Sequence, residues 1–182
     1  FTMSDVKNPL ISTMQKFQEV APDVSINLMT GSPNEVERGI IDGKLHIGII
    51  PDYQRHPSLD YFTLYDEDVG LFCGGQHPLM QAIQQNVALT EAEICKHKLV
   101  HRAYFESERL RQRKQKFPVG SGVYLGYFPR HCQDLMHGEF VELLPEVFGY
   151  STPICALWRA DRKHSLILQD FLQLLRDERP AG

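Results

Sequence analysis

The sequence has little positive charge and no long apolar run, and each shortage excludes a class of protein. Its 19 lysines and arginines are outnumbered by 23 aspartates and glutamates, which gives a net charge of −4 over 182 residues. Electrostatic binding of nucleic acid needs clustered positive charge, so we do not expect this chain to bind DNA by itself. No apolar run approaches the roughly 20 residues of a membrane span, and the first ten residues do not resemble a secretory signal.

Cysteine is also scarce, with only Cys73, Cys95, Cys132 and Cys155 in the whole chain. No CxxC pair occurs among them, which excludes zinc ribbons and thioredoxin-like redox centres. Four cysteines are too few for a disulfide scaffold. We expect reduced thiols in a cytoplasmic protein, while a redox switch is an alternative that the spacing leaves open.

The familiar strings of catalytic residues are missing as well. The chain contains no HExxH, GxSxG, GxxxxGK[ST] or GxGxxG sequence. His131 and Cys132 are adjacent, but neighbouring side chains on a strand or helix point apart. The acidic residues at 66–68 lack the glycine and glutamate spacing of a calcium loop. We therefore expect no enzyme activity, no metal and no other cofactor.

What the sequence does have is a clear alternation of helix and strand patterns. Apolar residues recur every three or four positions over 8–20, as in an amphipathic helix. Residues 24–29 alternate like a half-buried strand, 36–41 form a short helix, and 45–50 read as a buried strand. A strand, a helix and a strand in this order predict a βαβ unit with a parallel pair.

The rest of the chain continues the same mixture. Further strands are predicted at 61–64, 69–72, 99–100, 123–128 and 154–158, and further helices from 90, at 106–116 and at 166–175. The helix at 106–116 carries five basic and two acidic residues, and we interpret it as a solvated helix face or a lid. Together these patterns predict an α/β protein with two small lobes.

Four segments in the order of the chain resemble one known family. PDVSINLMTGSPNEVERGIIDGKLHIGII is followed by HPL at 77–79, GVYLGYFPRH at 122–131, and PICALWRADRKHSLILQDFLQLLR near the end. Together they resemble the effector-binding domain of LysR-type transcriptional regulators. The resemblance implies a fold like a type II periplasmic binding protein, with two α/β lobes, two crossover strands and a ligand cleft between the lobes. Lobe I would comprise 1–73 and 151–182, and lobe II 74–150.

Two departures from the family pattern qualify this resemblance. The N-terminal winged helix-turn-helix that binds DNA in the family has no counterpart in this chain. In addition, Val119 runs almost directly into Gly122, where the family places a strand and most of a helix. We expect that a segment is missing near 119–121, because lobe II would otherwise lack part of its core.

The resemblance also implies an effector site. Helix N-termini that meet in such a cleft favour anions, and an arginine fork matches a carboxylate. We therefore expect a small carboxylate or other anion as the effector, bound by residues at turns and strand ends. Ordinary capping, turn and core roles compete at each position. The candidate residues are Ser4, Thr30, Ser32, Pro51, His101, Arg102 and Phe128.

The predicted function is recognition rather than turnover. By resemblance, the chain forms a homodimer or tetramer through the first helix, with Leu10, Met14 and Phe17 at the dimer interface, and reaches DNA only through the N-terminal domain that it lacks. Effector binding would control DNA binding and transcription. The alternative is a solute-binding protein of the same fold that serves a transporter, and an enzyme on this fold is a weaker third candidate.

Overall fold

A computed structural model describes residues 9–51, 54–100, 108–133 and 139–178 as a mixed α/β protein. The chain divides into two compact units. Unit 1 comprises residues 1–66 and 153–182, and unit 2 comprises residues 67–152. Within the described residues, no helix is long and apolar enough to cross a membrane.

The strands of the described chain form a sheet with the order β1-β5-β2-β3, and β4 pairs with β2 beside this path. Strand β1 is antiparallel to β5, while β3 and β4 are antiparallel to β2. The unit boundary falls inside β2 and inside β5, so both long strands contribute to both units. The strands are β1 (Gly48–Pro51), β2 (Leu59–Gly74), β3 (Leu125–Pro129), β4 (Phe140–Glu142) and β5 (Tyr150–Arg159).

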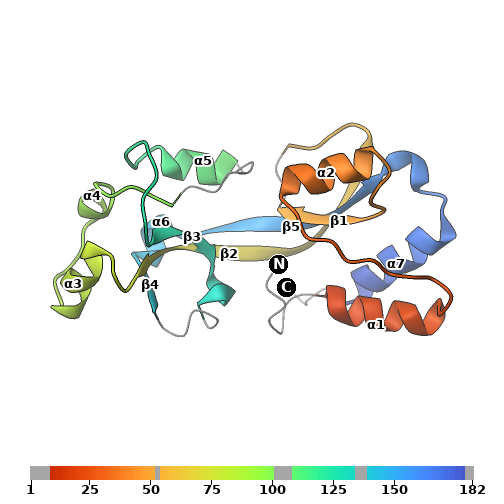
Figure 1. Ribbon diagram of the computed structural model, residues 1–182, viewed down its shortest axis with the longest axis horizontal. Coiled ribbons are helices and arrows are strands. Elements are labelled where there is room, and N and C mark those ends of the chain that lie inside the picture. Colours follow the sequence, from red (N-terminus) through yellow and green to blue (C-terminus); the bar gives the residue numbers. More distant parts are fainter. Residues whose placement is uncertain (1–8, 52–53, 101–107, 134–138, 179–182) are drawn as a thin grey trace. The chain divides into compact units, whose positions relative to one another are not determined.

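Unit 1 is built on two long helices, α1 (Leu10–Val20) and α7 (Leu166–Asp177), which lie side by side (Figure 1). Both confirm the helices predicted from apolar spacing, because that spacing places one stripe of side chains against the core. Phe17 of α1 meets Phe171 of α7 edge to face, with ring centroids 5.1 Å apart. Helix α2 (Pro33–Ile41) packs on β1, and the short helix η3 (Ala160–Arg162) follows β5.

Unit 2 contains the end of β2, the short strands β3 and β4, and several short helices. Its core includes the buried Leu71, Leu125 and Phe148. A capping box between Thr90 and Glu93 begins α4, which confirms the helix predicted from residue 90. The helices are α3 (Pro78–Gln84), α4 (Glu91–Ile94), α5 (Glu108–Lys114), η1 (Arg130–Cys132) and α6 (Pro145–Phe148).

The basic helix α5 uses part of its charge within unit 2. Arg109 Nη1 donates to the carbonyl of Ser151 at 2.6 Å. The guanidinium of Arg113 lies over the ring of Tyr150, 4.6 Å from its centroid, and donates to nearby carbonyls. Arg109 and Arg113, which belong to the predicted solvated helix, therefore also hold α5 against the start of β5.

Three predictions about strands are wrong. Val24–Met29 forms no strand, although Val24 and Ile26 do pack against the core of unit 1. The alternation therefore reports the burial of Val24 and Ile26 only, since Leu28 is 53% exposed, and it does not report hydrogen bonding to a neighbouring strand. The predicted parallel βαβ pair is wrong as well, because its first strand does not form and β1 pairs antiparallel with β5 instead. Leu99–Val100 is not a strand either, although the Leu99 carbonyl accepts the Gly122 N–H at 2.7 Å.

Candidate functional site

The predicted effector residue Ser32 is the N-cap of α2. Its hydroxyl oxygen accepts the Glu35 N–H at 3.4 Å, while the Glu35 carboxylate accepts the Ser32 N–H at 2.8 Å and the Ser32 hydroxyl at 2.7 Å. The hydroxyl, and next the backbone N–H, of Ser32 lower the pKa of Glu35. This reciprocal arrangement is a capping box, so Ser32 has a structural role regardless of any ligand.

The capping box limits how Ser32 can bind an anion. The Glu35 carboxylate already takes both donors of Ser32, and it places a negative charge at the helix N-terminus. An incoming carboxylate would have to displace Glu35 or bind beside it. The sequence does carry this signal, because a serine followed three residues later by a glutamate is typical of a capping box.

The other described candidates lie on both units. In unit 1, Thr30 is exposed and precedes α2, and Pro51 is half-buried at the end of β1. In unit 2, Phe128 is half-buried on β3, and its ring meets those of Phe72 and Phe140 at centroid distances of 6.5 and 6.2 Å. Phe128 therefore packs within an aromatic cluster of its own unit. Ser4, His101 and Arg102 lie outside the described residues, so their roles stay predictions.

The predicted dimer residues have different environments in α1. Leu10 and Phe17 are only 8% and 2% exposed and belong to the core of unit 1. Met14 is half-buried at the edge of that core, and the neighbouring Ile11 is 40% exposed. Leu10 and Phe17 therefore hold α1 in its own chain, and a dimer through α1 stays a prediction that would use the outer face of the helix.

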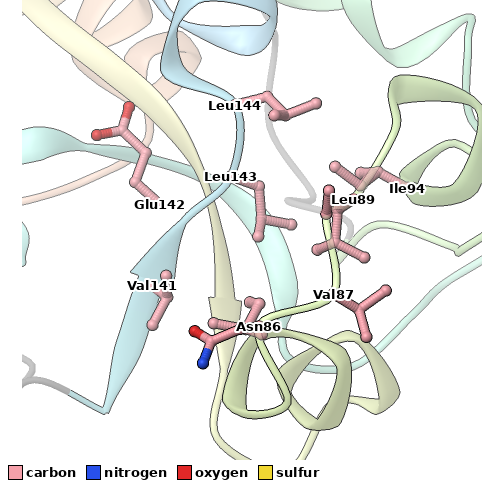
Figure 2. Close-up of a pocket in the computed structure, with 10 residues that line it drawn as sticks. Asn86, Val87, Leu89, Ile94, Val141, Glu142, Leu143 and Leu144 are labelled. Carbon is pink, nitrogen blue, oxygen red and sulfur yellow. The ribbon is translucent and has the colours of Figure 1, made fainter.

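A pocket of about 330 Å³ lies in unit 2, between the α3–α4 segment and the β4–α6 segment (Figure 2). We call it the unit 2 pocket. No sequence motif marks it, because its apolar residues read individually as ordinary core positions. Its lining residues are Ile83, Asn86, Val87, Ala88, Leu89, Ile94, Val141, Glu142, Leu143 and Leu144.

The ionisable group of this pocket is already paired. Glu142 Oε1 accepts a hydrogen bond from Arg130 Nε at 2.8 Å. Gly70 makes room for the carboxylate, because a Cβ atom at that position would lie 2.3 Å from Glu142 Oε1. The pair thus depends on the absence of a side chain on the adjacent β2.

Two histidines form a second polar cluster in unit 2. The rings of His77 and His97 meet edge to face, with centroids 4.7 Å apart. His77 is 7% exposed, and its Nδ1 accepts the Leu79 N–H at 3.2 Å, which caps α3. Burial, and next the neighbouring His97, lower the pKa of His77. Within the described ranges, no cluster of three or more histidine, cysteine or acidic residues could hold a metal ion.

Comparison with known proteins identifies the module. The family model of the LysR substrate binding domain matches residues 2–117, which is more than half of the chain. The chain belongs to the LysR substrate-binding domain family. This domain is the effector-binding regulatory part of LysR-type transcriptional regulators, a family of transcription factors rather than enzymes, which confirms the resemblance seen in the sequence.

A curated relative and two solved structures agree with this assignment. The HTH-type transcriptional activator BauR of Pseudomonas aeruginosa is 30% identical over 169 residues, which cover 84% of this chain and 54% of the relative. The LysR-type domain described here thus spans about half the length of that relative. Full-length CbnR complexed with its target DNA has a TM-score of 0.66 at 16% identity, covering 94% of this chain and 66% of CbnR. The BenM effector-binding domain with its effector benzoate has a TM-score of 0.62 at 15% identity, covering 92% and 84% of the two chains. These likenesses show a shared mixed α/β fold.

Proposed function

We propose that this LysR-type domain senses a small anionic molecule in a bacterial transcription regulator that acts in the cytoplasm. The observation that carries the proposal is family membership, because the matched module is the effector-binding one. The benzoate bound to the BenM domain supports a carboxylate as the class of effector. A helix N-terminus and an arginine fork are the groups expected to receive it.

The two compact units correspond in this proposal to lobes I and II, and the effector binds in a cleft between them. Ser4, Thr30, Ser32 and Pro51 would contribute from lobe I, and His101, Arg102 and Phe128 from lobe II. Differential affinity for two lobe arrangements would then change how a dimer or tetramer presents its DNA-binding domains. At Ser32 the effector competes with the Glu35 carboxylate, so a weak anion site is expected there unless Glu35 moves away.

A thermal-shift screen of the 182-residue chain tests the proposal. The probes are small aliphatic carboxylates, benzoate, amino acids and phosphorylated metabolites. A ligand at 100 times its Kd stabilises the folded state by about 2.7 kcal/mol, which corresponds to roughly 5–10 °C in Tm for a chain of this size. We expect one class of anion to give such a shift.

Variants then locate the binding. Arg102→Ala should abolish the shift, and Glu35→Ala should enlarge it, because both donors of Ser32 would then be available to the anion. Ser165→Ala is a matched control, because Ser165 also precedes a helix of unit 1 but makes no side-chain cap bond. A shift of equal size in all three variants would refute an anion site at these residues, and no shift with any anion would refute the effector class.

We also propose that the natural protein carries additional residues near 119–121. The family match ends at residue 117, and Val119 and Val123 are 96% and 69% exposed although both are apolar. Extra core residues would cover such side chains. Sequencing the gene across codons 117–123 decides the question, because an uninterrupted reading of the present residues would refute the missing segment.

A further inference from the structure

We propose that the unit 2 pocket binds a small neutral molecule that is largely hydrocarbon and carries one hydrogen-bonding group. This site goes beyond the proposed function, because every residue that lines it belongs to unit 2. Among its lining residues Ile94 and Leu143 are 0% and 3% exposed and belong to the core, while Val87 is 52% exposed. The pocket is therefore open to solvent on the side of Val87 and closed by core residues on the side of Ile94 and Leu143.

The size and walls of the pocket suit a hydrocarbon ligand. Its volume of about 330 Å³ is roughly twice that of an apolar cavity known to hold benzene, about 150 Å³. Aliphatic side chains such as Leu89 and Leu144 offer water no hydrogen-bond partners (Figure 2). Water there is easily displaced by an apolar group, and that displacement favours binding.

The charges of the pocket favour a neutral ligand. Glu142 is the one ionisable residue among those that line it, and Arg130 already neutralises its carboxylate. In Figure 2 that carboxylate points away from Leu89 and Ile94. A charged molecule would lose its hydration here without gaining a partner of opposite charge. The carboxylates expected at the effector site should therefore be rejected by the unit 2 pocket.

Asn86 supplies the polar group that would orient the ligand. It adopts a left-handed conformation with φ of 54°, which asparagine tolerates better than most residues. Its N–H donates to the Ile83 carbonyl at 3.0 Å, and the Val87 N–H donates to the Ala82 carbonyl at 2.9 Å. These bonds fix the end of α3, and the exposed Asn86 lines the same pocket as Val141 (Figure 2). An amide can both donate to and accept from a hydroxyl.

Three probes of similar shape test the inference: toluene, benzyl alcohol and benzoate. Each is titrated into the methyl-labelled 182-residue chain, and the NMR shifts of the Ile94, Leu143 and Val87 methyls are followed. We expect benzyl alcohol to shift all three methyls saturably, toluene to do so more weakly, and benzoate to leave them unchanged. Benzoate shifts elsewhere would report the proposed effector site, so the two hypotheses can fail separately.

Variants at the rim avoid damage to the core. Val87→Asp should weaken benzyl alcohol binding at least tenfold, while Val147→Asp is a matched control, because Val147 is 40% exposed on the neighbouring α6 but does not line the pocket. Asn86→Gly keeps the left-handed backbone and should cost benzyl alcohol about fivefold in affinity, the value of one hydrogen bond, without affecting toluene.

Several results would overturn the inference. One is the absence of saturable shifts with benzyl alcohol, and another is equal loss of binding in Val87→Asp and Val147→Asp. Shifts of the same methyls by benzoate with equal affinity would refute the argument from charge. Shifts that depend on protein concentration without any probe would show that a second copy of the chain covers the pocket instead.

Discussion

In the Phe17→Ala variant, unit 1 should unfold at a much lower denaturant concentration than in the parent chain. Phe17 is 2% exposed and meets Phe171 edge to face. A buried phenylalanine removes about 150–250 Å² from water, which at about 25 cal/mol per Å² corresponds to about 4–6 kcal/mol. Measured Phe→Ala changes in protein cores cost about 3–5 kcal/mol, so we expect a loss within that range.

The single tryptophan of the chain provides a local readout for this experiment. Trp158 is 7% exposed and packs against Leu168 and Leu172 of α7, so its fluorescence reports the unfolding of unit 1. With a urea dependence of about 1–3 kcal/mol per M, a loss of about 3–5 kcal/mol should lower the Phe17→Ala midpoint by about 1–5 M. Ile11→Ala is the control on the same helix, because Ile11 is 40% exposed, and it should cost less than about 1 kcal/mol.

A double-mutant cycle separates the ring pair from simple burial. Combining Phe17→Leu with Phe171→Leu should reveal a coupling of about 0.5–1.5 kcal/mol, which is typical of an edge-to-face pair. A loss below about 1 kcal/mol for Phe17→Ala would refute the packing of α1 on α7. The same packing makes Phe17→Asp a poor test of dimerisation, because a monomer could then result from unfolding. Ile11→Asp is the cleaner variant, and sedimentation velocity is the measurement.

Three more predictions follow from the caps and thiols. The pKa of His77 is lowered in the folded state, so the unfolded chain binds more protons, and unit 2 should lose stability as the pH falls below about 6.5. Urea titrations should show a flatter dependence of stability on pH for His77→Asn, because asparagine keeps an acceptor that can cap α3. Ser32→Ala should cost about 1 kcal/mol by loss of the cap, measured by the Trp fluorescence. Iodoacetamide at pH 8 should label Cys132 and spare Cys73 and Cys155, which are buried. Burial also raises the pKa of Cys73 to about 11, so little of the reactive thiolate is present. Mass spectrometry of the labelled peptides checks this, and rapid labelling of Cys73 would contradict it.

The long helices and their starts could be predicted because their signals are local. The apolar spacing of α1 and α7 places one face of each helix in the core. In the same way, a serine or threonine followed three residues later by a glutamate, as at Ser32 and Thr90, indicates where α2 and α4 begin. Such signals depend on residues within one or two turns of each other, so the sequence contains them in full.

Pairing and pockets could not be predicted, because they depend on distant partners. The alternation at 24–29 correctly indicates that Val24 and Ile26 face the core, but no local feature states whether a strand lies alongside. The unit 2 pocket likewise joins Val87 to Leu143, which are far apart along the chain. Each of its apolar side chains reads as ordinary core, and the cavity exists only because the segments do not fill the space between them.

The passage of β2 and β5 through both units has a consequence for how the chain is made. Unit 2 consists of the continuous stretch 67–152, whereas unit 1 needs residues from both sides of it. During synthesis, α1 emerges long before α7 and β5, which supply Phe171 and the strand partner of β1. Domains usually fold in the order in which they leave the ribosome. Here the inserted unit can complete its core first, while the part of unit 1 that precedes it must wait, with its apolar side chains uncovered, for β5 and α7 to be synthesised.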